Sequence, residues 1–212
     1  RSAWLTRTAA QTRAITASTN QACQRVDPKN RDERGRLDRA AATMVTVRTT
    51  QLSDLPSLVA CLNPVFLERR YLAIVEAIPA PEATSYHAAN IAAGYPHCVA
   101  VLGDRVVGLC DIVPAAPPRI AAQAHTGTLG VLLAPDARGY GIGERLLRAT
   151  LAAGRDKFER IQLNVYSHNE RAHRLYLRCG FVEEGRRRAA WKLDGMTSDI
   201  IDMGLLYSEQ TA

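Results

Sequence analysis

Three glycines within five residues, placed between an apolar segment and an amphipathic one, constrain this chain more than any other feature. Residues 138–143 read Arg-Gly-Tyr-Gly-Ile-Gly. Residues 128–133 are almost continuously apolar, as in a strand buried on both faces, and the apolar residues after the loop recur at helical spacing. Glycine lets the backbone turn tightly, and the free N–H groups and dipole of a helix start favour a bound phosphate. The pattern predicts a strand, an anion-binding loop and a helix in succession.

The loop alone is compatible with more than one function. A nucleotide P-loop needs Gly-Lys-Ser/Thr at its end, and none follows Gly143. The dinucleotide-binding fingerprint needs the spacing G-x-G-x-x-G, whereas these glycines stand at positions 139, 141 and 143. A glycine-rich turn without a ligand is the third alternative, since short glycine motifs recur by chance. The loop by itself therefore leaves a generic anion site or a turn without a ligand.

Length and composition limit the class of protein. The 212 residues suit one domain, or one domain with an appendage, and 47% hydrophobic residues suffice for a core. No apolar run is long enough to span a bilayer, so we expect no membrane partner. The five cysteines are odd in number and lack CxxC spacing, which argues against a disulfide framework or a zinc cluster. We therefore expect a reducing, cytoplasmic location and no metal.

The basic charge is concentrated near the N-terminus. Residues 1–43 hold nine Lys/Arg and four Asp/Glu, whereas residues 44–212 hold eighteen and seventeen. Because the body is nearly neutral, nucleic acid is not an expected partner. We predict that residues 1–43 form a basic appendage without a fold of its own and that residues 44–212 form the domain. Residues 1–26 lack acidic groups and also resemble an organelle transit peptide, and translated sequence upstream of Met44 is a further alternative.

Hydrophobic periodicity predicts a mixed α/β sheet with the strand–loop–helix unit at its centre. Residues 45–49 read as a strand, and Ser53-Asp54 supplies a cap for the helix after it. Gly103-Asp104 and Asp194-Gly195 mark the turns of two strand pairs, and Gly180 ends the last helix as a C-cap. The other predicted helices cover residues 65–78, 81–93 and 142–151, and the other predicted strands cover residues 97–102, 105–113, 161–166, 181–187 and 200–206.

Two motifs carry a resemblance to a known family. Residues 129–143 resemble the acetyl-CoA-binding motif of the GNAT superfamily of N-acetyltransferases, Arg/Gln-x-x-Gly-x-Gly/Ala, which Arg138, Gly141 and Gly143 fill. Downstream, residues 169–181 are similar to the second signature, Asn-x-x-Ala-x-x-Leu-Tyr…Gly-Phe. The resemblance covers about residues 44–207 and is nearest to the branch of ribosomal-protein N-acetylases and phosphinothricin acetyltransferases. It implies the GNAT (acyl-CoA N-acyltransferase) fold, an α/β fold whose mixed, mostly antiparallel central sheet is flanked by helices.

The resemblance also implies acetyl-CoA as the cosubstrate. The backbone N–H groups of the loop would hold the pyrophosphate, and the backbone of Leu132 and Leu133 would pair with the pantetheine arm where their strand separates from its neighbour. Asn169 would face the pantetheine, although its position suits a helix N-cap equally. The predicted cofactor-binding residues are Leu132, Leu133, Arg138, Gly139, Tyr140, Gly141, Ile142, Gly143, Asn169 and Tyr176.

Two residues are predicted to be catalytic. Tyr176 stands where the family has a proton donor, and a phenol of pKa near 10 can protonate a departing thiolate of pKa near 8.5; the alternative is a core tyrosine. His125 stands thirteen residues before Arg138, where some branches have a glutamate, and is the predicted general base. Its alternative is a strand-edge histidine without a catalytic role. His168 is a further candidate to line the cofactor channel.

The predicted function is transfer of an acetyl group from acetyl-CoA to a primary amine of a small molecule, peptide or protein, by direct attack in a ternary complex. A sensor of the same fold that binds acetyl-CoA without turnover is the alternative. In the family the acceptor groove is built by the first helices and the last hairpin. Its members are commonly dimers, so the resemblance also allows a homodimer. Arg186 to Arg188 are expected to alternate outward on an edge strand. Residues that could receive a cationic amine, or form a solvated face, are Glu68, Tyr71, Glu76, Glu82 and Tyr86.

Overall fold

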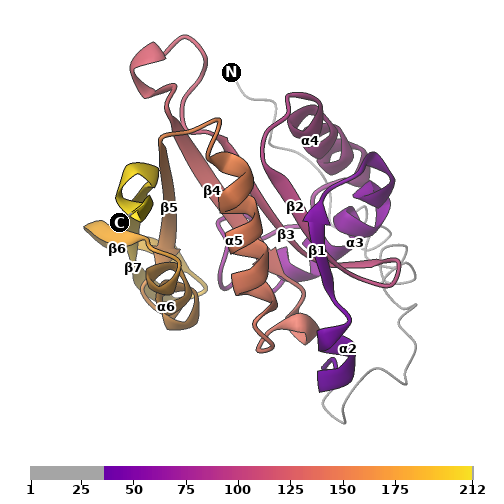
Figure 1. The fold of residues 1–212 in the computed structure, drawn as a ribbon. Coiled ribbons are helices and arrows are strands. Elements are labelled where there is room, and N and C mark those ends of the chain that lie inside the picture. Colours follow the sequence, from indigo (N-terminus) through magenta and orange to yellow (C-terminus); the bar gives the residue numbers. More distant parts are fainter. Residues whose placement is uncertain (1–35, 212) are drawn as a thin grey trace.

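The computed structural model describes residues 36–211, whose strands form one mixed sheet in the order β1-β2-β3-β4-β5-β7-β6 (Figure 1). Neighbouring strands pair antiparallel except β4 and β5, which are parallel. The strands are β1 (Thr46–Thr49), β2 (His97–Leu102), β3 (Arg105–Pro114), β4 (Thr126–Leu133), β5 (Arg160–Tyr166), β6 (Val182–Leu193) and β7 (Met196–Leu206). The predicted mixed, mostly antiparallel sheet is confirmed.

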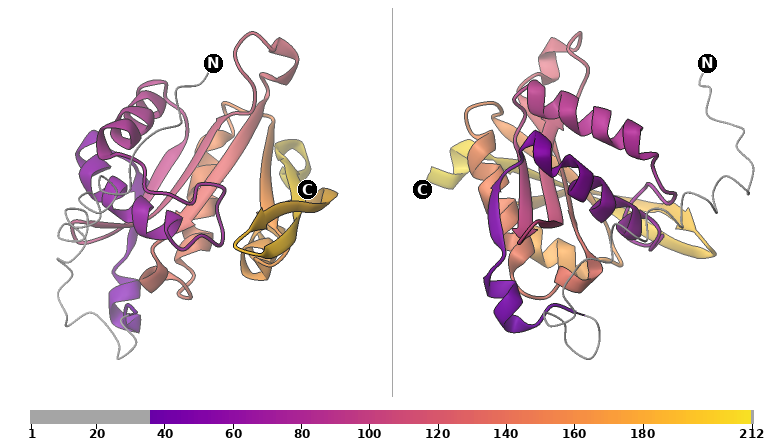
Figure 2. Two further views of the ribbon diagram at one scale, coloured as in Figure 1. Left: turned by 180° about the vertical axis from the view of Figure 1, so that it is seen from behind. Right: turned by 90° about the vertical axis from the view of Figure 1, so that its right-hand side faces the viewer.

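Helices cover both faces of this sheet (Figures 1 and 2). One face carries α5 (Ile142–Gly154), with α6 (Glu170–Arg178) beside β5, and the other carries α3 (Leu55–Phe66) and α4 (Ala80–Ala92). The short helix α2 (Arg39–Thr43) precedes β1. No helix in the described part of the chain is both long and apolar enough to cross a bilayer. Single 3-10 turns are η2 (Leu52–Asp54), η3 (Ala121–Gln123), η4 (Pro135–Ala137) and η5 (Tyr207–Thr211).

The central elements follow from their apolar spacing. Ile142, Leu146 and Leu147 recur on one side of α5, and each is at most 1% exposed where it packs on the sheet. In β5, Ile161 and Val165 point into the core at alternate positions. The predicted helix and strand are therefore confirmed, and together with β4 they position the loop at residues 138–143.

Eight residues of the predicted appendage lie within the described range. Leu37 is fully buried in the core, and α2 adds the buried Ala41. The carboxylate of Asp38 begins α2 by accepting a hydrogen bond from the backbone N–H of Ala41 at 2.7 Å. Residues 36–43 are thus packed against the domain, while the prediction for residues 1–35 lies outside the described residues.

The predicted helix at residues 65–78 is wrong. Helix α3 ends at Phe66, and Arg69 has a left-handed backbone with φ of 51°. Leu67 and Ile74 are 49% and 46% exposed, so no continuous apolar stripe holds this segment on the sheet. The Asn63 side chain instead binds both the N–H and the carbonyl of Ile78, which brings the chain back toward α3. Residues 67–79 therefore form a loop.

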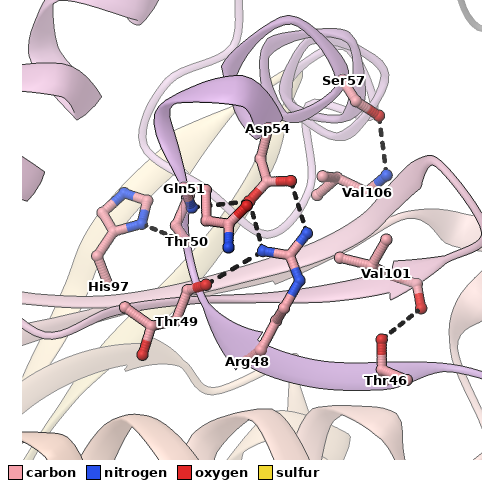
Figure 3. Close-up of polar contacts among 10 residues, drawn as sticks. All are labelled: Thr46, Arg48, Thr49, Thr50, Gln51, Asp54, Ser57, His97, Val101 and Val106. Carbon is pink, nitrogen blue, oxygen red and sulfur yellow. Dashed lines mark hydrogen bonds and ion pairs between the residues drawn. The ribbon is translucent and has the colours of Figure 1, made fainter.

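Asp54 lies at the start of α3 as predicted, but its carboxylate does not cap the helix. It accepts two hydrogen bonds from the Arg48 guanidinium, at 2.6 and 2.7 Å, and one from the Gln51 N–H at 2.8 Å (Figure 3). The Arg48 hydrogen bonds hold the pKa of the Asp54 carboxyl below its usual value. On the first turn of α3, the Ser57 hydroxyl accepts from the N–H of Val106 in β3 (Figure 3). These contacts fix the helix to β1 and β3.

The arginines of the edge strand β6 are exposed at consecutive positions and do not alternate as expected, because no layer covers either side of this part of the strand. Arg187 makes a 2.8 Å ion pair with Asp202 of β7, and Arg186 lies 3.5 Å from Asp199. Arg188 is exposed. Charged side chains on an edge strand oppose pairing with other chains.

Strand β4 is not buried on both faces as its composition predicted. Leu129 is buried, but Gly130 is exposed and Val131, Leu132 and Leu133 are only half-buried. The reason is its pairing: β4 pairs with β5 only from Thr126 to Thr128, although its pairing with β3 continues to Leu133. Beyond Thr128 the two central strands separate and leave one edge of β4 open.

Candidate active site

A cleft with a volume of about 490 Å³ lies between the separated strands. Its walls come from β4 on one side and from the end of β5 and α6 on the other. Arg138, Gly139, Gly141 and Gly143 of the glycine loop line it, whereas the predicted Tyr140 and Ile142 do not. Tyr71 and Leu72 reach it from the loop at residues 67–79. Segments from both halves of the sheet therefore meet around one cavity.

The glycine loop presents a row of backbone N–H groups. Gly139 and Gly141 have φ of 103° and 77°, a conformation that side chains with a Cβ rarely adopt. Gly141 precedes the first turn of α5. Within the described residues, the N–H groups of positions 139–143 form no hydrogen bond with the protein. Such a row at a helix N-terminus is suited to a phosphate group.

Arginines from α6 add positive charge beside this row. Arg171 and Arg178 both line the cleft, and an Arg171 nitrogen lies 3.3 Å from where a Cβ on Gly139 would stand. Neither residue was among the predicted site residues. Their spacing of seven residues on one helix is the signal that could have found them, because it places both on one face.

The motif residue Arg138 turns its side chain to the protein. Its guanidinium donates two hydrogen bonds to the Leu133 carbonyl, at 3.1 and 2.9 Å, and pairs with Glu68 at 2.9 Å. It also lies over the Tyr71 ring, 5.6 Å from the centroid. Arg138 therefore holds the end of β4 to the loop after α3, so that its side chain positions the loop whose backbone faces the cleft.

The loop is also held from the N-terminal side. Arg36 donates to the Arg138 carbonyl at 2.6 Å and lies over the Tyr140 ring. The Tyr140 hydroxyl donates to the carbonyl of Leu37. Tyr140 thus faces residues 36–37, a contact that no local pattern in the sequence indicated.

Asn169 caps α6 and lines the cleft. Its side-chain oxygen accepts a hydrogen bond from the Ala172 N–H at 3.3 Å. The same residue belongs to the cleft wall. The position of Asn169 thus suits both roles considered from the sequence, the N-cap and the contact with pantetheine. The hydrogen bond of the cap is present in the structure.

The cap predicts a measurable loss of stability in Asn169→Ala. This variant should lower the free energy of unfolding by about 1 kcal/mol, as for other N-cap truncations. Asn169→Ser restores a capping oxygen and should be close to wild type in urea unfolding. An alanine variant as stable as wild type would contradict the capping role.

Tyr176 belongs to both the core and the cleft. Its side chain is 7% exposed and packs edge-on against Phe181, with centroids 5.9 Å apart. It also lines the cleft, and its hydroxyl has no hydrogen-bond partner among the described residues. Burial, followed by the nearby Cys110 and Cys179 thiols, raises the pKa of the phenol well above its usual value. The group therefore stays protonated.

His125 does not lie at the cleft. It is exposed and precedes the first residue of β4, whereas the cleft begins at Leu129 and extends toward the other end of that strand. At about 3.3 Å per residue, His125 is about 20 Å from the open edge at Val131. Its carbonyl accepts from the N–H groups of Glu159 and Arg160. The structure therefore does not bring the predicted base to the other site residues.

An aromatic cluster lies next to Tyr71, the one member of the cluster that lines the cleft. His168, Tyr71, Tyr166 and Trp191 stack with ring centroids 5.0 to 6.2 Å apart. His168 also makes a 2.7 Å hydrogen bond with the Arg70 carbonyl. The cluster joins the loop at residues 67–79 to the hairpin of β6 and β7. His168 takes part in this cluster and is not among the residues that line the cleft.

The acidic residues considered as an acceptor site are dispersed. Glu68 is paired with Arg138, and Glu76, Glu82 and Tyr86 are exposed. None of these four lines the cleft. Tyr71 alone of that set does, and the exposure of Glu76, Glu82 and Tyr86 supports the solvated-face interpretation for those three.

Comparison with known proteins places this geometry in context. The model of the acetyltransferase (GNAT) family matches residues 66–181. Ribosomal-protein-alanine N-acetyltransferase from Brucella melitensis has a similar structure (TM-score 0.70, 24% identity, 76% of this chain and 99% of that chain covered). So do yncA from Salmonella typhimurium, solved with its cofactor acetyl-CoA (0.73, 19%, 80% and 97%), and a phosphinothricin acetyltransferase from Sinorhizobium meliloti in complex with acetyl-CoA (0.70, 21%, 77% and 88%).

Proposed function

Because the chain belongs to the acetyltransferase (GNAT) family, we propose that it moves the acetyl group of acetyl-CoA to a primary amine by direct attack in a ternary complex. The amine belongs to a small molecule, a peptide or a protein. The observation that carries this proposal is the cleft itself, which has a row of free N–H groups at the glycine loop and the Tyr176 phenol on its wall. Acyl transfer from a thioester needs a held donor, a stabilised carbonyl oxygen and a protonated leaving thiol.

The residues around the cleft fit acetyl-CoA. The N–H groups at residues 139–143 would hold the pyrophosphate, with Arg171 and Arg178 adding positive charge. The open edge of β4 beyond Thr128 has unpaired backbone groups on the β5 side, where the pantetheine amides would form hydrogen bonds. The predicted Leu132 and Leu133 lie in this segment, where the Leu133 carbonyl already accepts two hydrogen bonds from the Arg138 guanidinium. An N–H of the same edge would polarise the thioester carbonyl.

Tyr176 would act on the departing sulfur. Since its pKa is raised, the phenol is a weaker acid than a free tyrosine, and complete transfer of its proton to a thiolate is unfavourable by itself. The hydroxyl would therefore donate a hydrogen bond to the sulfur and pass its proton on as it receives one from the nitrogen. Its lack of a protein partner leaves it available for that contact.

Tyr176→Phe should lower kcat about a hundredfold and change the acetyl-CoA dissociation constant less than threefold. The phenylalanine keeps the packing against Phe181, so the variant should fold. Steady-state thiol release and isothermal titration with acetyl-CoA measure the two quantities. Tyr207→Phe is the matched control: it removes a buried hydroxyl that donates to the Leu151 carbonyl at 2.6 Å, outside the cleft. The control should lose stability but keep kcat, and equal kinetics for both variants would contradict the role of Tyr176.

The direct test is a panel of amines scored for acetyl-CoA-dependent thiol release, with the acetylated product confirmed by mass spectrometry. The names of two similar proteins suggest the first acceptors, a peptide with an N-terminal alanine and phosphinothricin. The aromatic cluster at residues 71, 166, 168 and 191 supports acceptors with an apolar group beside the amine. Binding of acetyl-CoA without product from any amine would favour the sensor alternative, and no binding would contradict both.

The location and assembly of the protein stay proposals. Two described cysteines, Cys98 and Cys110, are buried free thiols. This supports the reducing, cytoplasmic compartment inferred from the sequence. The homodimer and the absence of a metal remain predictions.

A further inference from the structure

A carboxylate stands beside the cleft at the point where the two central strands separate. Asp111 of β3 is directly opposite Gly130 of β4, two positions beyond the last residue of β4 that pairs with β5. Gly130 is exposed and lines the cleft. A Cβ on Gly130 would stand 2.8 Å from Oδ1 of Asp111, so the carboxylate lies over this glycine. Asp111 is not itself among the residues that line the cleft, and Gly130, which is, has no side chain to stand between the two.

The neighbours of Asp111 on the same face of the sheet are two buried histidines. His97 of β2 is paired in register with Asp111, and His87 reaches the same place from α4. A ring nitrogen of each histidine and a carboxylate oxygen of Asp111 lie within 4.8 Å of one another. Nδ1 of His87 is 3.0 Å from Nε2 of His97, whose Nδ1 is 2.7 Å from the Thr50 hydroxyl (Figure 3 shows the last contact). The histidines are thus bonded to each other and to Thr50.

The pKa values of His87, His97 and Asp111 suit a carboxylate base at neutral pH. Burial lowers the pKa of His87 and of His97 to about 4, so both are neutral at pH 7. Burial raises the pKa of Asp111 to about 6. Within the described residues no ion pair to Asp111 is seen, and its titratable neighbours include the two histidines and the buried Cys110 thiol. The carboxylate is therefore ionised at pH 7 but binds a proton readily.

The other titratable groups of the cleft wall are poorer proton acceptors. Glu144 is paired with Arg148 at 2.9 Å and with Arg178 at 3.5 Å, beside the glycine loop. Tyr176 is protonated, and the rest are arginines and Tyr71. Since His125 lies outside the cleft, no described residue of the wall is an evident base.

We propose that Asp111 is the proton acceptor of the reaction, a role that rests on the proposed acetyl transfer. The carboxylate takes one proton from the acceptor ammonium and leaves a neutral amine, whose nitrogen forms the new bond to the acetyl carbon as the carbon–sulfur bond breaks. The nitrogen loses a second proton, which reaches the sulfur by way of the Tyr176 hydroxyl. Asp111 then releases its proton to solvent, and the products are an amide, CoA thiol and one proton.

The test compares wild type, Asp111→Asn and Asp111→Ala in kcat/KM from pH 5 to 9, with any acceptor that the panel identifies. In wild type, activity should fall as the pH drops through about 6. At pH 7, Asp111→Asn should lose activity about a hundredfold, and the fall in its activity below pH 6 should disappear. Its acetyl-CoA affinity should be close to wild type, and its melting temperature should be no lower, because a buried charge is removed. In Asp111→Ala, added formate should restore at least tenfold activity by replacing the carboxylate. The exposed His125→Asn variant is the control and should keep the wild-type profile.

The outcomes separate this inference from the proposed function. An active enzyme in which Asp111→Asn keeps wild-type kcat/KM and the same acidic limb would overturn the role of Asp111 alone. Loss of wild-type activity on dialysis against EDTA, restored by Zn²⁺, would also overturn it, because the three side chains would then be metal ligands. A wild-type protein that binds acetyl-CoA but acetylates no amine would refute the acetyl transfer, and Asp111 would lose its role with it.

Discussion

Gly141→Asp is expected to weaken acetyl-CoA binding about a thousandfold while the protein stays folded. Gly141 has φ of 77°, a backbone conformation that aspartate and asparagine tolerate better than other residues. A Cβ there meets no atom within 4 Å, and the residue lines the cleft. The new carboxylate would occupy the N–H groups assigned to the pyrophosphate. Two like charges about 4 Å apart near a protein surface repel by about 4 kcal/mol, which corresponds to about a thousandfold in affinity.

Two matched variants isolate the charge and the position. Gly141→Asn has nearly the same shape without the charge and should weaken binding only about tenfold. Gly103→Asp places the same residue at another left-handed glycine, with φ of 57° and nothing within 4 Å, in the turn between β2 and β3. It should bind acetyl-CoA as wild type does. Isothermal titration measures all three, and tight binding by a folded Gly141→Asp protein would rule out the loop as the pyrophosphate site.

The buried histidine pair predicts a large loss of stability in mild acid. His87 and His97 titrate near pH 4 in the folded protein and near 6.5 when unfolded. Between these values the unfolded chain binds protons that the folded protein excludes, so stability is present above pH 6.5 and is lost as the pH falls toward 4. Each histidine contributes up to about 3 kcal/mol.

The titration of Asp111 changes the stability in the opposite direction as the pH falls. Its folded pKa of about 6 lies above the ordinary value of 3.8, so between these values the folded protein binds the extra proton and gains stability as the pH falls. The gain from Asp111 offsets about 3 kcal/mol of the stability that the two histidines lose. The free energy of unfolding of the wild type should therefore fall by about 3 kcal/mol between pH 6.5 and 4. The ion-paired carboxyl of Asp54 has a pKa below its usual value, so its protonation lowers the stability only at a lower pH.

Urea unfolding at several values between pH 7.5 and 4 tests both signs. Asp111→Asn should make the loss in acid steeper, because the compensating proton is gone. His87→Gln should make it shallower, since one buried histidine no longer titrates. The exposed His125→Asn should follow wild type. A shallower curve for Asp111→Asn, or wild-type stability that does not change down to pH 4, would show that the cluster does not titrate as described.

Much of the fold was predictable because its signals are local. The apolar stripe from Ile142 to Leu151 indicated α5, the alternation from Ile161 to Val165 indicated β5, and Gly103-Asp104 and Asp194-Gly195 marked the two hairpins. Each signal depends on residues within one element. The helix predicted at residues 65–78 failed because Leu67 and Ile74 have no surface to cover, and that is a property of the folded molecule.

The candidate site was predictable in part for the same reason. The glycines of the loop, the capping position of Asn169 and the helical face of Tyr176 can be found by spacing. His125 was chosen by counting along the chain from Arg138, but the count placed it at the far end of β4. Asp111 was missed because no motif contains it, and it reaches the cleft only through the register between β3 and β4.

The sequence by itself determined the family, the order of the strands and the loop of residues 138–143, since these rest on short-range spacing and on backbone conformations that glycine adopts freely. Only the tertiary structure decided where β4 leaves β5, what Arg138 holds, and which charged groups face the cleft. Those features depend on strand register and packing between residues far apart in the chain. Gly130 shows the difference. In the sequence it is one more small residue in an apolar strand, and in the sheet it lines the cleft with the Asp111 carboxylate over it.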